Sequence, residues 1–181
     1  MTCIVGVELD GQLWLGGDAA STRDHEVFVR KNPKVFKVEN MLIGFSGSFR
    51  IGQLLQFSFK PVQHVWGRDD FQYIVTSVVD SIRGLLNENG AMIKDEMGDS
   101  HDSEFIIGYR GKFYIIDSDF HVEIPTENYV ATGTGAAYAL GALHAMKKHK
   151  ISPAKKIHKA LSAAEEYCTG VRKPFTILSM A

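Results

Sequence analysis

The chain has 181 residues, of which 45% are hydrophobic and 23% are charged, and its formal net charge is -1. This length supplies one sizeable hydrophobic core, so we expect a single domain over residues 1–181. Because positive and negative charges nearly cancel, no global field attracts nucleic acid or an anionic membrane. We expect neither as a partner.

The N-terminus and the cysteines indicate the compartment. Cys3 and Cys168 are not at the spacing of a metal-binding or redox pair, which fits a reducing environment. The chain opens without a basic leader, and no uncharged apolar run reaches the roughly 18 residues that span a bilayer. We expect a cytoplasmic protein whose processing is the loss of Met1 before the small residue Thr2.

The first half of the chain is predicted to hold a block of strands followed by helices. Alternating apolar residues and turn signals predict a hairpin of strands over 3–7 and 13–17, a polar loop over 21–32, strands over 34–38 and 41–45, and helices over 49–57 and 70–89. The longer helix carries Ile74, Val78, Ile82 and Leu85 on one stripe. Since the first strand begins almost at residue one, the terminus itself should be held in the sheet.

The second half repeats this order. Its predicted elements are a Gly- and Asp-rich loop over 90–103, strands over 104–108, 112–116, 120–124 and 129–132, helices over 136–149 and 153–168, and a last strand over 175–180. Strands and helices in separate blocks favour antiparallel sheets with helices layered outside them. The expected fold class is therefore α+β, a four-layer αββα sandwich.

Thr2 is the residue that would carry chemistry if it became the chain terminus. A hydroxyl needs a base to become a good nucleophile, and an α-amino group with a pKa of roughly 7.7–8.0 can act as that base. A nearby cation such as Lys34 would favour the neutral amine, and Asp18 could hold Lys34 in place. Without context, a threonine at position two is common, and Asp18 with Lys34 could equally be a structural ion pair.

The context comes from a family resemblance. The segments Thr2-Cys3-Ile4-Val5-Gly6-Val7, Gly16-Gly17-Asp18 and Lys34-Val35-Phe36-Lys37 resemble the N-terminal half of proteasome β-subunits and of the HslV-type peptidases. The resemblance implies Thr2 as the nucleophile, with Asp18 and Lys34 supporting it. The turn at residues 44–48 is similar to the family's glycine-rich turn, which makes the backbone N–H of Gly47 the expected oxyanion donor.

The C-terminal half carries the resemblance further, with three departures. Gly133-Thr134-Gly135 stands where the family usually has Gly-Ser-Gly, and Glu166-Tyr167-Cys168-Thr169-Gly170 resembles the family's Asp-x-x-Ser-Gly element. The resemblance implies that Thr134, Glu166 and Thr169 hold the amine and hydroxyl of Thr2. Glu166 places its carboxylate about one methylene farther out, and a misplacement of roughly 1 Å can cost about a hundredfold in rate.

The expected substrate-binding residues are Thr22, Phe36, Phe45 and Phe49. In the family, positions near the phenylalanines shape the pocket for the residue before the cut. The alternative is that these rings are core residues, and the sequence leaves that choice open.

Two other kinds of site are excluded. Gly133-x-Gly135 is not a dinucleotide fingerprint, because Tyr138 occupies the third glycine position. His144 and His149 are five residues apart and so lie on different faces of a helix, which argues against a zinc site. We expect no metal and no cofactor.

The expected function is a threonine-type endopeptidase that cleaves peptides or unfolded proteins through an acyl-enzyme on Thr2. The resemblance implies a self-compartmentalising homo-oligomeric ring, a hexamer or heptamer and single or doubled, fed by an ATP-dependent unfoldase. Two alternatives stay open. One is a catalytically silent ring or scaffold protein with the same fold, and the other is an amidase for a small molecule.

Overall fold

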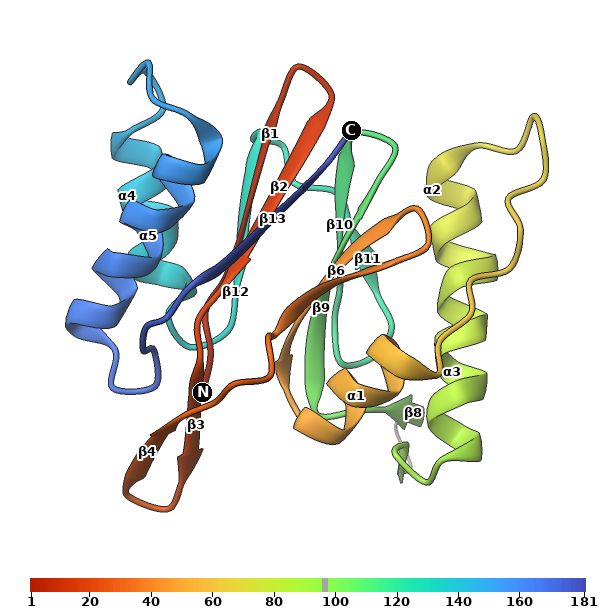
Figure 1. Ribbon diagram of the computed structural model, residues 1–181. Helices are drawn as coiled ribbons and strands as arrows, with labels where there is room; N and C mark the ends of the chain where they lie inside the picture. The colour runs from red at the N-terminus through yellow and green to blue at the C-terminus, as the bar shows by residue number, and fades with distance from the viewer. Residues whose placement is uncertain (96–97) are drawn as a thin grey trace.

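The computed structural model describes residues 1–95 and 98–181 and shows two sheets stacked between two layers of helices (Figure 1). This arrangement confirms the predicted four-layer αββα sandwich.

The first sheet holds the N-terminus of the chain. Its strands lie in the order β12 (Tyr129–Thr132), β1 (Ile4–Leu9), β2 (Gln12–Gly17) and β13 (Thr176–Met180), and all neighbours are antiparallel. Thus β1 is an interior strand from its first residue, with Ile4 opposite Gly17 on one side and Thr132 on the other. The residues just before β1 therefore lie next to the ends of β2 and β12.

The second sheet packs face to face against the first. Its strands run in the order β11 (Val122–Glu123), β10 (Lys112–Ile116), β9 (Ser103–Tyr109), β6 (Met41–Gly47) and β5 (Val35–Val38), again antiparallel. The β6–β9 register places Gly47 opposite Ser103. Lys34 immediately precedes β5, and Gly47 ends β6, so the second sheet positions both candidate residues.

The helices cover the outer faces, as Figure 1 shows. The first sheet is covered by α4 (Ala136–Ala145) and α5 (Pro153–Tyr167), and the second by α1 (Phe49–Phe57), α2 (Asp70–Tyr73), the π-helical turn η1 (Ile74–Val78) and α3 (Val79–Glu88). The helix expected to reach His149 ends at Ala145.

The N-terminal segment that includes β1 contributes side chains to two regions of the hydrophobic core. Cys3, Val5 and Val7 pack against α4 and α5, whereas Ile4 packs between the two sheets. Successive side chains of a strand point to opposite faces, so both faces of β1 are buried. The start of the chain is therefore fixed on both sides.

The buried stripe of the long helix differs by one position from the prediction. Ile74, Val78, Ile82 and Leu86 are fully buried, whereas Leu85 is only partly buried. A repeat of four residues drifts off one face of a regular α-helix, which has 3.6 residues per turn. The wider π-helical turn at η1 offsets part of this drift.

Two predicted loops contain strands. The segment expected to be a polar loop over 21–32 forms a hairpin of β3 (Ala20–Arg23) and β4 (Glu26–Val29). Every residue of β4 is exposed, so the strand has no buried face that would give its sequence an alternating apolar pattern. In the expected loop over 90–103, β7 (Ile93–Asp95) pairs with β8 (Gly98–Ser100), and residues 96–97 lie outside the described residues.

Within the described ranges, every helix is too short or too polar to cross a membrane.

Candidate active site

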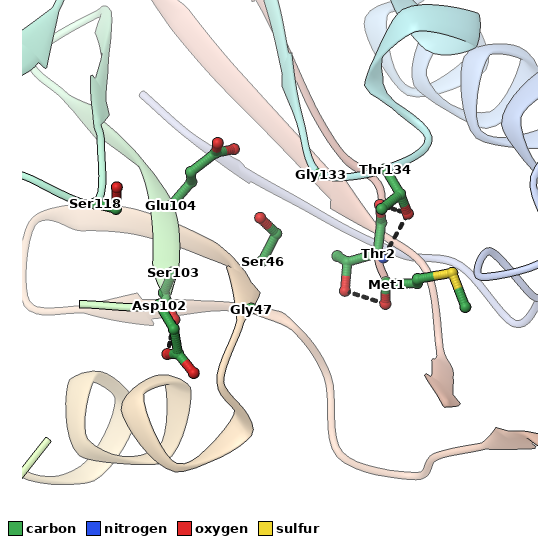
Figure 2. A pocket seen from close by; sticks show the side chains of 10 residues that line it. All are labelled: Met1, Thr2, Ser46, Gly47, Asp102, Ser103, Glu104, Ser118, Gly133 and Thr134. Atoms are coloured by element: carbon green, nitrogen blue, oxygen red, sulfur yellow. Dashed lines mark hydrogen bonds between the residues drawn. The ribbon is translucent and has the colours of Figure 1, made fainter. Parts of the chain in front are cut away.

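A cavity of about 410 Å³ opens at the start of β1, between the ends of the two sheets (Figure 2). Its lining consists of Met1, Thr2, Ser46, Gly47, Asp102, Ser103, Glu104, Ser118, Gly133 and Thr134. Segments from both sheets and from the turn before α4 contribute to it. Three of the sequence-predicted site residues, Thr2, Gly47 and Thr134, line the same cavity.

The turn that precedes α4 holds Thr2 through hydrogen bonds to its backbone. Its carbonyl oxygen accepts a hydrogen bond from the N–H of Gly135 at 3.1 Å. Its own N–H donates to Thr134 Oγ1 at 3.2 Å. Gly133 has φ +89°, and a Cβ there would collide with the carbonyl group of Thr2. This close approach requires glycine at position 133.

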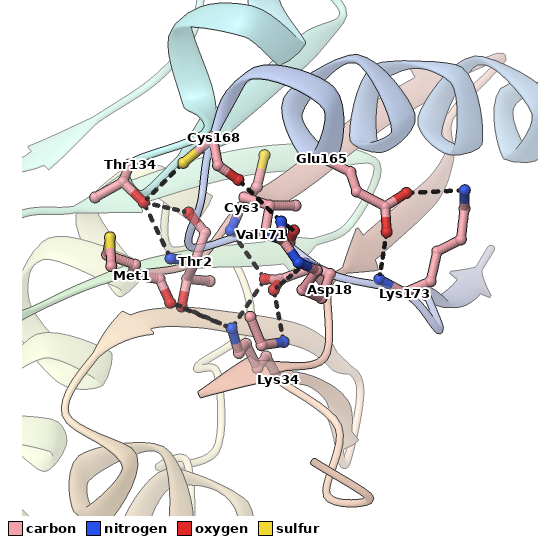
Figure 3. A network of polar contacts seen from close by, with 12 residues as sticks. Met1, Thr2, Cys3, Asp18, Lys34, Thr134, Glu165, Cys168, Val171 and Lys173 are labelled. Carbon is pink, nitrogen blue, oxygen red and sulfur yellow. Dashed lines mark hydrogen bonds and ion pairs between the residues drawn. The ribbon is translucent and has the colours of Figure 1, made fainter. Parts of the chain in front are cut away.

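Lys34 connects Thr2 to Asp18 (Figure 3). Lys34 Nζ donates to Thr2 Oγ1 and to Asp18 Oδ1, each at 2.9 Å. Lys34 is 0% exposed, and the other two residues are 2% exposed. The structure therefore brings the predicted set of Thr2, Asp18 and Lys34 into direct contact.

Asp18 is fixed by backbone donors as well as by Lys34. The N–H groups of Cys3 and Ala20 donate to its two carboxylate oxygens at 3.0 and 2.8 Å, and that of Arg172 donates at 3.3 Å. These hydrogen bonds hold the carboxylate in one orientation. Asp18 follows β2 directly, and its neighbour across the sheet, Cys3, precedes β1, so the hairpin register sets this geometry.

Burial dominates the electrostatics of the site. It lowers the pKa of the Lys34 ammonium, an effect that the charge of Asp18 opposes. Burial raises the pKa of the Cys3 thiol to about 12, and the negative charge of Asp18 adds to that shift. Cys3 therefore stays a neutral thiol packed beneath α5 and is not a candidate nucleophile.

Met1 covers the candidate nucleophile. Its carbonyl oxygen accepts hydrogen bonds from Thr2 Oγ1 at 2.6 Å and from Lys34 Nζ at 3.4 Å. The side chain of Met1 lies against Gly170, where a Cβ would overlap it. While Met1 is attached, the nitrogen of Thr2 is an amide and has no basic lone pair.

Gly47 stands at the end of β6 with φ +104°. A Cβ on this residue would collide with the carbonyl oxygen of Asp102 and lie 2.7 Å from Ser103 Cα. Its neighbour Ser48 donates its N–H to Ser103 Oγ at 2.9 Å. The close approach of β6 and β9 thus requires glycine next to the cavity.

Two expected site residues do not reach Thr2 in the structure. Glu166 is exposed at the end of α5, and Thr169 is exposed just beyond it. Among the described residues, neither side chain has a hydrogen bond or ion-pair partner. The helix instead brings Cys168 close, with Sγ 3.6 Å from Thr134 Oγ1.

Several residues of the cavity were missed from the sequence. Asp102, Ser103, Glu104 and Ser118 line it beside Gly47. Pairing of β6 with β9 places Ser103 there, although the two strands are far apart along the chain. Ser46, which also lines the cavity, could have been found from the sequence, since it lies inside the glycine-rich turn that predicted Gly47.

The four expected substrate-binding residues separate into two groups. Thr22 and Phe49 line a second cavity of about 420 Å³. Phe36 and Phe45 are 5% and 4% exposed and belong to the core between the second sheet and α1–α3. Phe45 packs edge-on against Phe49, with ring centroids 6.3 Å apart, and so supports the ring that lines the cavity.

In the part of the chain that the structure describes, no three or more His, Cys, Asp or Glu side chains are grouped so that they could hold a metal ion.

Comparison with known proteins adds a sequence relative and solved structures. No protein-family model matches the chain. The chain is 25% identical over 183 residues to the ATP-dependent protease subunit HslV of Caldicellulosiruptor saccharolyticus, which covers 99% of this chain and 98% of that one.

The structure is similar to that of BPH from Thiobacillus denitrificans in complex with epoxomicin, with a TM-score of 0.84, 19% identity and coverage of 99% of this chain and 98% of that one. The eukaryotic HslV of Trypanosoma brucei gives a TM-score of 0.71 at 18% identity, with 98% of each chain covered. These two likenesses establish the fold across nearly the whole chain.

Proposed function

Because the chain belongs with the HslV-type and proteasome-like N-terminal nucleophile hydrolases, we propose that it is a threonine-type endopeptidase with Thr2 as its nucleophile. The single observation that carries the proposal is the contact of Lys34 Nζ with both Thr2 Oγ1 and Asp18 Oδ1 at 2.9 Å. A buried cation aimed at a hydroxyl oxygen stabilises the negative charge that develops there.

The proposed mechanism begins with removal of Met1, which frees the α-amino group of Thr2. The amine, positioned by Thr134, takes the proton of the Thr2 hydroxyl as its oxygen attacks the scissile carbonyl. Lys34 keeps the amine neutral through its charge, and Asp18 orients Lys34. The N–H of Gly47 binds the oxyanion, and the amine passes the proton to the leaving amine. Water then hydrolyses the acyl-enzyme ester, which releases the carboxylate product and restores the Thr2 hydroxyl.

We propose peptides and unfolded proteins as substrates and a homo-oligomeric ring as the working form. The segment between α1 and α2 supports assembly, because its apolar side chains face solvent: Trp66 is 99% exposed, Val65 64% and Val62 54%. Patches of this kind mark contact surfaces. An ATP-dependent unfoldase partner is consistent with the similarity to HslV, a subunit of an ATP-dependent protease. A native mass spectrum that shows only monomer would contradict the ring.

A catalytically silent ring or scaffold protein is the second candidate. It is favoured by one observation, the exposed placement of Glu166 and Thr169 away from Thr2. In this case the network of Thr2, Asp18 and Lys34 would only stabilise the fold. Nothing in the structure favours the small-molecule amidase over either candidate.

The deciding experiment is the intact mass of the purified protein, with and without a peptide epoxyketone. The proposal expects loss of Met1 and one adduct per chain, which Thr2→Ala abolishes. Degradation of an unfolded protein such as casein, but not of small amides alone, then separates the endopeptidase from the amidase. Retention of Met1 with no adduct would contradict the peptidase proposal and favour the catalytically silent ring or scaffold protein.

A further inference from the structure

A second cavity lies beside the candidate active site and has a different chemical character. Its lining consists of Ser21, Thr22, Arg23, Phe28, Arg30 and Phe49, with a volume of about 420 Å³. The Phe49 ring links it to the site, since its centroid lies 5.9 Å from Lys34 Nζ, which contacts Thr2 Oγ1 at 2.9 Å. The Phe49 wall of the cavity and Thr2 Oγ1 are thus both neighbours of the Lys34 ammonium.

Arg30 is the chemically distinctive residue of the cavity. Its guanidinium carbon lies 3.7 Å from the centroid of the Phe49 ring, a short cation–π contact. Within the described residues, its side chain has no acidic or hydrogen-bonding partner, and its backbone N–H donates to Ala19 O at 2.8 Å. Arg83 and Arg110, by contrast, form ion pairs with Asp99 and Asp70 at 3.0 and 3.1 Å.

A guanidinium that lines a cavity and has no acidic partner among the described residues can bind an anionic group. Burial lowers the pKa of Arg30, which means that the surroundings disfavour its charge. Arginine nevertheless stays protonated in proteins and offers five N–H donors in a planar fork. A carboxylate matches that fork with two parallel hydrogen bonds, and desolvation strengthens them.

The rest of the lining suits the same ligand. Ser21 and Thr22 add hydroxyl donors, Arg23 adds a second positive charge, and no acidic residue lines the cavity. Phe28 and Phe49 provide apolar walls for the methylene groups of a side chain. An acidic side chain fits each of these features, whereas a lysine or arginine side chain would meet two like charges.

We propose that this cavity receives the acidic side chain, Glu or Asp, of the substrate residue that supplies the scissile carbonyl, and that Arg30 determines this preference. The inference rests on the proposed peptidase function, since it names the substrate class of that site. The product peptides would then end in an acidic residue.

The activity test uses peptides that differ only in the residue before a fluorogenic amide: Glu, Gln, Lys or Leu. We expect kcat/KM for Glu to exceed that for Gln by about tenfold or more, because the amide lacks the charge-assisted hydrogen bonds. Arg30→Gln should bring this ratio close to one, and Arg30→Glu should reverse the preference in favour of Lys. Arg30→Lys, which keeps the charge but loses the fork, should give an intermediate ratio.

Arg110→Gln is the matched control, because it removes an arginine that does not line the cavity and that pairs with Asp70. The Glu/Gln ratio should not change in this variant. Equal kcat/KM for Glu and Gln in wild-type protein that forms the Thr2 adduct would overturn the inference and leave the peptidase proposal standing. A ratio that survives Arg30→Gln in folded protein would overturn the role of Arg30.

A binding measurement separates this cavity from catalysis. Acetylated peptides that end in Glu or Gln are titrated calorimetrically into the Thr2→Ala protein, with and without Arg30→Gln. Tighter binding of the Glu peptide, lost with Arg30→Gln, supports the cavity even if no turnover is found, in which case the peptidase proposal alone fails. Equal binding of both peptides would count against the cavity as an acidic subsite.

Discussion

Lys34 Nζ lies 2.9 Å from Thr2 Oγ1, although Thr2 precedes a strand of the first sheet and Lys34 precedes a strand of the second. The same ammonium lies 2.9 Å from Asp18 Oδ1, and both side chains of this ion pair are 0% exposed. One buried cation thus joins the two sheets at the point where the candidate nucleophile emerges. Stability and activity should depend on it together.

Loss of Lys34 should destabilise the protein strongly. Lys34→Met leaves the carboxylate of Asp18 buried without its counter-ion, and we expect a loss of about 3–5 kcal/mol in the free energy of unfolding. Adding Asp18→Asn removes the orphaned charge, so the double variant should regain about 1 kcal/mol or more. Urea unfolding of the four proteins in this cycle measures the coupling, and strictly additive losses would argue against the buried pair.

Replacement of Gly47 should impair both folding and chemistry. Gly47→Ala forces a Cβ toward the carbonyl of Asp102 at φ +104°, so we expect a loss of about 1–3 kcal/mol in stability. Because the change also displaces the expected oxyanion donor, the rate of epoxyketone labelling should fall about a hundredfold.

Gly84→Ala is the control for this variant. Gly84 lies in α3, where an added methyl group would meet no atom outside its own turn of helix, so alanine there should stabilise by about 0.5–1 kcal/mol. A similar effect of both substitutions would remove the special role of Gly47.

Thr134 should matter more than Glu166 for the chemistry. Thr134→Val removes the hydroxyl that contacts the nitrogen of Thr2, and kcat/KM should fall about tenfold. Glu166→Gln alters an exposed side chain, and kcat/KM should stay within about twofold of wild type. Steady-state kinetics on a fluorogenic peptide compares them. A larger effect of Glu166→Gln would restore the role that the family resemblance implies.

Cys3 should make stability depend on pH in the alkaline range. Burial raises its pKa to about 12 in the folded protein, from 9.0 in an unfolded chain. The folded state therefore keeps a proton that the unfolded state releases, so this stability is present below pH 9.0 and declines toward pH 12. The slope should be about 1.4 kcal/mol per pH unit.

Urea unfolding at pH 8, 9 and 10 measures this slope as the difference between wild type and Cys3→Ala. Cys168→Ala serves as the control, because Cys168 is only partly buried. Parallel pH curves for wild type and Cys3→Ala would contradict the prediction.

The sequence determined the layer order and predicted the central contact of the candidate site, that of Thr2, Asp18 and Lys34. Alternating apolar residues predicted β1, β2, β5, β6 and β10, because period-two burial is a local property of a strand. It failed for β4, whose residues are all exposed, and it missed the shift from Leu85 to Leu86, which depends on a π-helical turn. Thr2, Asp18, Lys34 and Gly47 were found because their spacing resembles a family.

Only the tertiary structure decided which of these residues touch. Strand pairing brings Asp102 and Ser103 beside Gly47, and the end of α5 presents Cys168 where Glu166 and Thr169 were expected. That Arg30 has no acidic partner among the described residues is likewise invisible in the sequence, since it depends on which acidic groups the fold places within reach. Local patterns fix strands and turns, whereas charge partners are set by packing between segments far apart in the chain.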